Sequence, residues 1–416
     1  MRVRSVLLAV TSWAMTPLAA QVPSVPAEHP AVRGALGAIR SDNAWTLEQQ
    51  VSICEIPAPP FAETRRGAEL ADRFKALGLV KVRIDSVGNV IGERPGSGRG
   101  PRVVLSAHLD TVFPESTDVR VRREGTRFSG PGIGDDCRGL AVLLAVARAL
   151  RDNTTATTGD LVFVGTVGEE GPGNLRGVRH LVDRQTAGRV DYFLSVDGTG
   201  LGLTSRAVGS HRYRVAITGP GGHSYGDFGM PNPIHALGRA IAAIGDLTVP
   251  AAPRTTFSVG VISGGTSVNS IAMSGAMDVD LRSESQAALD TLDAALRRAV
   301  AGAVDAEHAR WPLSAARLTA EWVEIGKRPA GTQPDTAPIV QTALAAARAL
   351  GFAPRTSASS TDANIPMSLG IAAITMDGGG RGDGAHSLGE WYDDGEDGWK
   401  GPQWVLLTVV ALAGMR

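Results

Sequence analysis

Three short apolar runs, each followed by acidic or imidazole side chains, constrain the fold of this chain more than any other feature. The runs cover residues 103–105, 161–167 and 192–196, and the segment LAVLLAVARAL between the first two is a helical pattern with few polar positions. Strands that are apolar on both faces are typical of sheets that helices cover on both sides. This alternation predicts an α/β domain with three layers around a mixed, mostly parallel sheet.

The pattern changes in the middle of the chain. HRYRVAIT, TTFSVGVISGG and IAMSGAMDVDLRS alternate apolar and polar residues, and two helical stretches accompany them. Strands with one wet face plus two helices predict a self-sufficient α+β unit of the split βαβ, ferredoxin-like kind. We expect this unit to be inserted at residues 207–322 between two parts of the main domain, residues 27–206 and 323–416.

The composition argues against a disordered chain and a nucleic-acid-binding protein, and the first residues suggest export from the cytosol. With 43% hydrophobic and 20% charged residues the chain has the balance of a folded protein, and a net charge of −1 gives no basic surface for nucleic acid. Residues 1–20 have the order of a cleaved secretory signal peptide: a basic start, an apolar stretch and small residues before Gln21. We therefore expect an exported protein, periplasmic or secreted, without stable membrane association after cleavage.

The chain contains two cysteines, Cys54 and Cys137. In an exported protein two thiols can pair, but nothing in the sequence fixes the distance between them. The sequence leaves both the paired and the free state open.

Acidic and imidazole side chains gather in five places, each after a strand-like run or in a Gly-rich turn. A single member has an ordinary explanation, such as a helix N-cap or a solvated strand end. Together they supply oxygen and imidazole ligands in a proportion that suits Zn²⁺ or a similar divalent ion, provided that they converge on one edge of the sheet. The five groups are His108 with Asp110, Asp135 with Asp136, Glu169 with Glu170, Asp197, and His386.

These segments resemble a known family, the co-catalytic zinc metallopeptidases and amidohydrolases that include peptidase T, glutamate carboxypeptidase and aminoacylase. The segments SAHLDTV, GIGDDCRG, GEEG, VDG and AHS stand in the family's order and at similar spacing over nearly the whole chain after the signal region. The resemblance implies a catalytic main domain, an inserted lid and dimerisation domain, and two divalent metal ions. Zn²⁺ is the first choice of metal, with Co²⁺ or Mn²⁺ as alternatives.

The resemblance also implies how the ligands divide. Asp135 would bridge both metals, Glu170 and His386 would complete one site, and His108 and Asp197 the other. Asp110 would orient the ring of His108 from behind.

The same resemblance implies that Glu169 is the general base. By the same resemblance it would take a proton from a metal-activated bridging water and pass it to the leaving nitrogen. The family usually has a cis peptide bond after the bridging aspartate, here Asp135–Asp136. It also commonly has Lys two residues after that aspartate, where this chain has Cys137 followed by Arg138. The role of that Lys therefore cannot be assigned to either residue from the sequence.

Three residues of the inserted unit match family positions with roles in substrate binding. His223 in GPGGHS would reach the active site of the partner subunit and stabilise the oxyanion, which implies a homodimer formed through the lid. Asn269 would contact substrate. Arg282 would hold a substrate carboxylate, a task that suits a guanidinium fork.

These features predict a di-zinc metallopeptidase of the exopeptidase type that acts on short peptides. Deacylation of an N-acyl amino acid is the alternative, because the chemistry at the carbonyl is the same and only the pocket differs. A serine esterase is a rival from another class, since GHSYG fits a nucleophile elbow and Ser224, Asp362 and His386 follow the required order. No helix can start after Ser224, however. A binding protein without catalysis on the same scaffold is a third reading.

Overall fold

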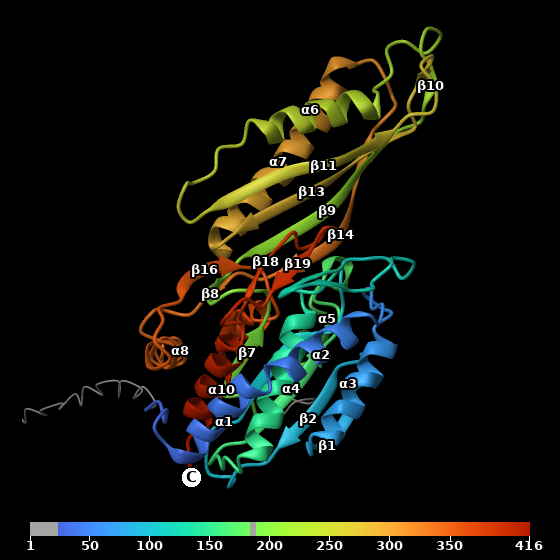
Figure 1. The fold of residues 1–416 in the computed structure, drawn as a ribbon. Helices are drawn as coiled ribbons and strands as arrows, with labels where there is room; N and C mark the ends of the chain where they lie inside the picture. Colours follow the sequence, from blue (N-terminus) through green and yellow to red (C-terminus); the bar gives the residue numbers. More distant parts are fainter. Residues whose placement is uncertain (1–23, 184–188) are drawn as a thin grey trace, which may run out of the picture.

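The computed structural model describes residues 24–183 and 189–416, so the segment expected to be a signal peptide lies outside the described residues. Figure 1 shows a larger α/β body, built from both ends of the chain, and a smaller α+β body built from its middle. The predicted α/β fold with a mixed central sheet is confirmed.

The central sheet has the strand order β1-β2-β6-β3-β7-β17-β8-β15, with β16 paired to β8. Neighbours from β6 to β17 run parallel, and the strands outside this group are mainly antiparallel. The strands are β1 (Val80–Ile84), β2 (Val90–Arg94), β3 (Val103–His108), β6 (Leu161–Thr166), β7 (Tyr192–Val196), β8 (Gly202–Ala207), β15 (Gly331–Thr332), β16 (Arg355–Ser359) and β17 (Ala372–Met376).

Helices cover both faces of this sheet because its inner strands are apolar on both. Along β3, Val103 and Leu105 point into the core that contains most of the helices, whereas Val104 joins the core on the other side. Each such aliphatic side chain contributes about 1.5–3 kcal/mol by leaving water. The first layer holds α1 (Pro30–Ser41), α2 (Asn43–Cys54), α3 (Thr64–Ala76), α4 (Cys137–Asp152), α8 (Pro338–Ala349) and α10 (Lys400–Ala413), and the second holds α5 (Arg176–Val182) and α9 (Asn364–Ser368).

A small antiparallel sheet joins two segments that are far apart in the sequence. Its order is β18-β19-β5-β4, so the chain after Met376 pairs with the chain before α4. The strands are β4 (Arg122–Glu124), β5 (Arg127–Ser129), β18 (Arg381–Asp383) and β19 (Trp391–Asp393).

The smaller body has the split βαβ topology. Its sheet runs in the order β11-β13-β9-β14, all pairs are antiparallel, and two helices pack on one face. The elements are β9 (Gly209–Thr218), α6 (Pro233–Gly245), β11 (Thr255–Gly264), β13 (Ser274–Ser283), α7 (Gln286–Arg310) and β14 (Thr319–Arg328). The boundary that we placed at residue 322 falls inside β14, which continues to Arg328 and carries the chain back to the larger body.

None of the helices in the described part of the chain combines the length and the apolarity that crossing a bilayer requires.

Candidate metal centre

The central parallel strands bring the predicted ligands to one edge of the sheet. β6, β3 and β7 are neighbours and run in the same direction. His108 is the last residue of β3, the Glu169–Glu170 pair follows β6, and Asp197 follows β7 directly. Side chains at the carboxyl ends of parallel strands face the crevice where α/β proteins bind their ligands.

Asp135 lies between two imidazoles and offers one oxygen to each. Its Oδ1 is 2.9 Å from Nε2 of His108, and its Oδ2 is 3.2 Å from Nε2 of His386. The same His386 nitrogen is 3.0 Å from Oε1 of Glu170. The peptide bond Asp135–Asp136 is cis, as the family resemblance led us to expect.

Two groups of three side chains have ligand atoms that all lie within 4.8 Å of one another, and both contain Asp135. One group is His108, Asp135 and Asp197, and the other is Asp135, Glu170 and His386. Carboxylate oxygens and imidazole nitrogens in groups of three suit a divalent ion that keeps a further position open. A third grouping, His108 with Glu169 and Glu170, also meets the distance criterion. The first two groups fit two metal ions that share one carboxylate.

The electrostatics of the metal-free centre fit this assignment. Burial alone would raise the pKa of Asp135, but hydrogen bonds from His108 and His386 outweigh it and hold that pKa below its usual range. The pKa of His386 rises to about 10 because Asp135 and Glu170 accept from its ring. Protons on the imidazole rings of His108 and His386 therefore bind the same carboxylates that a metal cation would bind together with these rings.

Glu169 differs from its neighbour in its contacts. Its Oε1 accepts a hydrogen bond of 2.8 Å from Arg328, and each of these two side chains is only 6% exposed. Arg328 also donates to the main-chain carbonyl of Glu169. Burial raises the pKa of Glu169 to about 8, with the Arg328 guanidinium acting in the opposite direction. Glu169 is therefore held beside the proposed metal ligands by a cation of its own.

Two aspartates fix the frame in which the ligands stand. The carboxylate of Asp110 accepts the main-chain N–H groups of Glu169 and Glu170 at 3.0 and 2.8 Å. Nδ1 of His108 lies 2.9 Å from the carbonyl oxygen of Asp110 and 3.8 Å from its carboxylate. Asp110 therefore orients the imidazole through its main chain and the glutamate pair through its side chain. Asp136 caps α4 at Gly139 and accepts from the N–H of His108, each at 3.0 Å.

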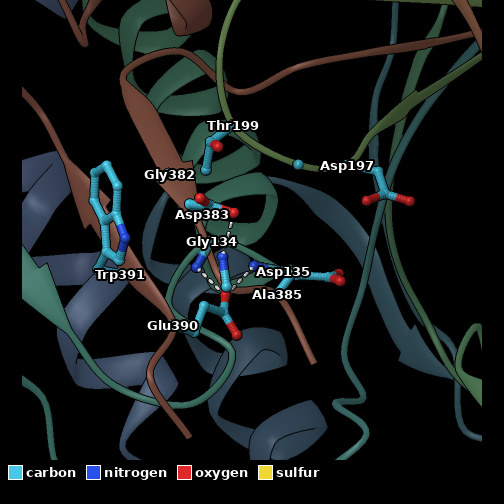
Figure 2. A pocket seen from close by; sticks show the side chains of 11 residues that line it. Gly134, Asp135, Asp197, Thr199, Gly382, Asp383, Ala385, Glu390 and Trp391 are labelled. Carbon is cyan, nitrogen blue, oxygen red and sulfur yellow. Dashed lines mark hydrogen bonds between the residues drawn. The ribbon is translucent and has the colours of Figure 1, made fainter. Parts of the chain in front are cut away.

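The loop that carries Asp135 is fastened by Glu390, which sequence reasoning missed. Glu390 is 2% exposed, and its carboxylate accepts the N–H groups of Gly132, Gly134 and Asp135 at 2.8–2.9 Å. Figure 2 shows the bonds from Gly134 and Asp135 converging on Glu390. Glu390 stands four residues after His386, so the same segment carries one proposed ligand and positions another.

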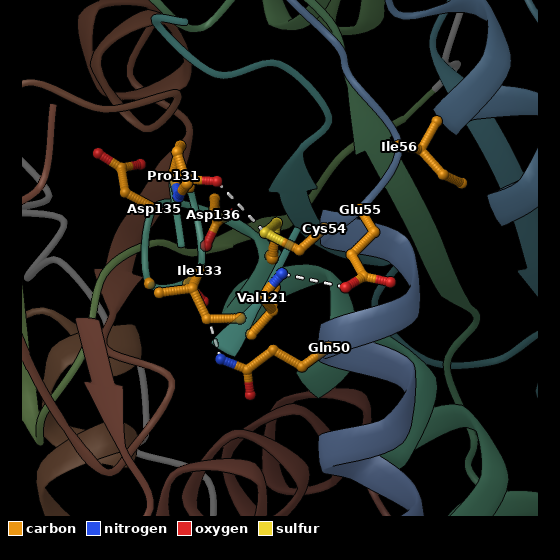
Figure 3. The surroundings of a disulfide bond; sticks show 12 residues. Gln50, Cys54, Glu55, Ile56, Val121, Pro131, Ile133, Asp135 and Asp136 are labelled. Carbon is orange, nitrogen blue, oxygen red and sulfur yellow. Dashed lines mark hydrogen bonds between the residues drawn. A yellow bond between two sulfur atoms is a disulfide. The ribbon is translucent and has the colours of Figure 1, made fainter. Parts of the chain in front are cut away.

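A disulfide holds the other side of this loop. Cys54 at the end of α2 and Cys137 at the start of α4 are bonded, with Cα atoms 5.4 Å apart (Figure 3). Gln50, one turn earlier on α2, donates to the carbonyl of Ile133 at 2.8 Å. Arg138, fully buried, donates to the carbonyls of Gly378 and Gly398 at 2.7 Å each. Where the family commonly has Lys, this chain therefore has a cross-link to α2 and an arginine that holds the C-terminal segment.

A cavity of about 490 Å³ opens beside these ligands and reaches the inserted unit. Asp135, Glu169, Glu170, Asp197 and His386 line it, and so do three arginines, Arg212, Arg282 and Arg328. Arg282 thus lies where the resemblance implies a contact with substrate. Arg328 escaped sequence reasoning because the end of β14 lies beyond the boundary that we placed at residue 322.

His223 and Asn269 lie at the tip of the smaller body. His223 belongs to β10 (Gly222–His223), which pairs with β12 (Ser270–Ile271), and Figure 1 places β10 at the end farthest from the larger body. Both side chains are exposed, and neither lines the cavity of the same chain.

The structure does not bring the rival serine triad together. Ser224 follows β10 at the tip, the ring of His386 contacts Asp135 and Glu170, and Asp362 accepts from Thr166. No hydrogen bond joins Ser224 to His386 or Asp362 among the described residues. A serine nucleophile in this arrangement is therefore wrong.

Fold and donor set together define a candidate metal-binding centre at the carboxyl edge of an α/β sheet. Residues 104–407 match the family model "Peptidase family M20/M25/M40", and the chain belongs to this family. The resemblance stated from the sequence motifs is thereby confirmed.

Two individual relatives share about 30% sequence identity or less with this chain, over less than half of its length. Carboxypeptidase G2 of Pseudomonas sp. (strain RS-16) is 30% identical over 189 residues, which are 43% of this chain and 45% of that protein. Succinyl-diaminopimelate desuccinylase of Corynebacterium glutamicum is 28% identical over 193 residues, 46% of this chain and 52% of that protein. The matches span about half the length of these relatives. The crystal structure of aminopeptidase PepT from Bacillus cereus has a TM-score of 0.72 at 20% identity, covering 89% of this chain and 98% of that one, and supports the fold.

Proposed function

We propose that this protein hydrolyses an amide bond in short peptides with the help of two divalent metal ions, Zn²⁺ in the first place. The observation that carries the proposal is Asp135, whose two oxygens face two separate imidazoles while Glu169 stands close by with a cation of its own. A carboxylate able to bridge two ions, beside a second one able to move a proton, suits two-metal hydrolysis.

Bound divalent ions would lower the pKa of a water molecule and polarise the amide carbonyl. The protein's own residues do the rest. His108 and Asp197 would hold one ion, Glu170 and His386 the other, and Asp135 both. Glu169 takes the proton of the attacking water and delivers it to the leaving nitrogen.

Glu169 can move a proton because of what surrounds it. Asp110 fixes its main chain, so its carboxylate stays at one place relative to the glutamate beside it. Arg328 donates to one oxygen of Glu169, and among the described residues no hydrogen bond reaches the other oxygen. A base within hydrogen-bond reach and with a pKa near the working pH is the efficient choice.

Deacylation of an N-acyl amino acid is a second candidate function. A desuccinylase is among the relatives, and the position of Arg282 in the cavity suits the free carboxylate of either kind of substrate. The catalytic steps are the same, so the two candidates differ in the group that occupies the acyl side of the cavity.

Two further proposals concern the whole protein. We infer export from the signal-like residues 1–20, and the Cys54–Cys137 disulfide supports a destination outside the reducing cytosol. We also infer a homodimer formed through the smaller body. The position of His223 supports it: β10, which carries this residue, lies at the far end of the smaller body, and His223 does not line the cavity of its own chain.

A panel of dipeptides, tripeptides and N-acetyl amino acids, assayed with chelator-treated protein reconstituted with Zn²⁺, tests the central proposal. We expect hydrolysis that needs the metal and that falls about 10²–10⁴-fold in kcat for Glu169→Gln, because general acid–base catalysis typically contributes that much. Metal analysis of the variant should still find two ions per chain. Near-normal turnover of Glu169→Gln would show that another group moves the proton.

A further inference from the structure

The cavity beside the metal ligands carries more guanidinium groups than the proposed function uses. Of the three arginines that line it, Arg328 is bound to Glu169 and Arg282 is expected to hold one substrate carboxylate. Arg212, on β9, has no role in that scheme. The proposal that follows rests on the proposed function and concerns the same cavity.

Arg212 and Arg282 share a single acidic partner. Nε of Arg212 donates to Oδ1 of Asp280 at 2.9 Å, and Nε of Arg282 donates to Oδ2 of the same carboxylate at 2.7 Å. In the sheet Arg212 stands directly opposite Asp280, and Arg282 lies two residues farther along β13. One carboxylate therefore holds two guanidinium groups side by side and neutralises only one of them.

Both arginines keep the outer end of the fork free. Each uses only Nε on Asp280, and the hydrogen bonds of the described residues include none from their Nη groups. The two side chains are 23% and 41% exposed, so these donors are accessible. An arginine whose Nη groups are unused can bind a carboxylate through charge-assisted hydrogen bonds.

The next pair on the same strands shows the contrast. Arg214 and Asp278 also stand opposite each other on β9 and β13, but Arg214 donates both Nε and Nη2 to the carboxylate, at 2.7 and 2.8 Å. Neither residue lines the cavity. The open fork therefore occurs where the sheet faces the metal ligands, and the closed pair occurs farther along.

A third polar group lies between the arginines. Ser210 on β9 is opposite Arg282 of β13 on one side and Arg328 of β14 on the other. It is 1% exposed, and its Oγ has no hydrogen-bond partner among the described residues. Residues 213, 215 and 217 point to the helices of the smaller body, so Ser210 and Arg212 belong to the opposite face of the strand.

The four carboxylates that line the cavity cannot serve as partners for these forks. Three of them are the proposed metal ligands, and the fourth, Glu169, is bound to Arg328. A ligand must therefore bring its own anions. Two open guanidinium forks match two carboxylates.

We propose that Arg212, held beside Arg282 by Asp280, forms a subsite for a second substrate carboxylate. The preferred substrate is then an amide of an acidic amino acid, with its α-carboxylate and its side-chain carboxylate both on the leaving side of the bond. Arg212 is the residue that selects the acidic side chain.

Isosteric substrate pairs test this selection. Ala-Glu is compared with Ala-Gln, and N-acetyl-glutamate with N-acetyl-glutamine, so the result does not depend on which acyl group the enzyme prefers. We expect the Zn²⁺-loaded protein to favour the acidic member at least about tenfold in kcat/KM, mainly through KM, because an open fork gains an ion pair with one member only. Arg212→Gln should remove most of this preference, and Arg212→Lys, which keeps the charge but loses the fork, should remove part of it.

Arg214→Gln is the matched control, because it breaks the equivalent ion pair outside the cavity and should leave the preference as in the unaltered protein. Calorimetry gives a second readout without turnover: glutarate should bind the Zn²⁺-loaded protein at least about tenfold more tightly than butyrate, and Arg212→Gln should abolish the difference. Equal kcat/KM for acidic and neutral members would overturn the subsite while hydrolysis itself stands. No hydrolysis of any substrate with metal present would instead overturn the proposed function.

Discussion

At the scale of single residues, Glu169 is a buried acid, and its burial disfavours the charged form of its carboxyl group. In the metal-free protein its pKa is raised to about 8 by burial, whereas a glutamate in an unfolded chain titrates near pH ~4.3. The native state therefore keeps a proton that the unfolded state releases between these values. Because the native state binds more protons, its stability must fall as the pH rises through this window.

Urea unfolding of chelator-treated protein at pH 5.5 and pH 8.0 measures this effect. We expect a lower midpoint at pH 8.0, and a smaller decrease for Glu169→Gln, which has no carboxyl group to titrate at this position. If the protein and this variant lose the same stability between the two pH values, the raised pKa does not belong to Glu169.

The residues that the sequence predicted and those it missed differ in how they reach the centre. His108, Glu170 and Asp197 follow apolar strands directly, so strand order alone brings them to one edge. Arg328 and Glu390 act through contacts with residues 159 and 255–258 positions away. No periodicity in the sequence encodes a contact of that kind, because it depends on how β14 and the C-terminal segment return to the first domain.

At the scale of elements, the loop before α4 is fastened from both sides. Glu390 gathers three N–H groups on one side, while the Cys54–Cys137 disulfide and Gln50 tie the other side to α2. A ligand that bridges two ions must present both oxygens at fixed positions, and groups behind a ligand typically change metal affinity about 10–100-fold. This clamp, formed by Glu390, the Cys54–Cys137 disulfide and Gln50, supports the proposal that Asp135 in this loop serves two metal sites.

Glu390→Gln tests the clamp. An amide end would turn an NH₂ group toward N–H donors that now meet an oxygen, so we expect zinc affinity to fall about 10–100-fold. Competition with a chromophoric chelator measures it. Glu307→Gln is the control: Glu307 is also buried and accepts the N–H of Asn232 at 3.1 Å, but it lies in the smaller body. Unchanged zinc affinity in Glu390→Gln, or an equal loss in both variants, would contradict the clamp.

The sequence predicts the presence of the strands better than it predicts where the inserted unit ends. The alternation in residues 211–218 and the apolar runs at 103–105 and 192–196 correspond to β9, β3 and β7. β14 was missed because TAEWVEIGKR is partly exposed at both faces and has no turn signal at residue 322. Its pairing with β9 over nine positions, rather than its own pattern, makes it a strand.

At the scale of the whole molecule, the smaller body presents two ends with different surroundings. Its near end, with Arg212, Arg282 and Arg328, lines the cavity, while its far end carries the exposed side chain of His223 on the short strand β10. In a symmetric dimer the same surface serves both subunits, so each far end can lie over the cavity of its partner. The proposed oxyanion contact of His223 would then join one chain's metal centre to the other chain's lid.

Mixing two inactive variants tests this arrangement. A Glu169→Gln chain keeps His223, and a His223→Ala chain keeps Glu169. If His223 acts across the dimer, a mixed dimer has one complete site, formed by Glu169 of one chain and His223 of the other. Refolding or subunit exchange at equal amounts should then restore about a quarter of the normal activity, because about half of the dimers are mixed and each has one working site. If His223 serves its own chain, every site in the mixture lacks one residue and no activity returns. Size-exclusion chromatography with light scattering, run on both variants, shows whether each still forms the dimer on which the comparison depends.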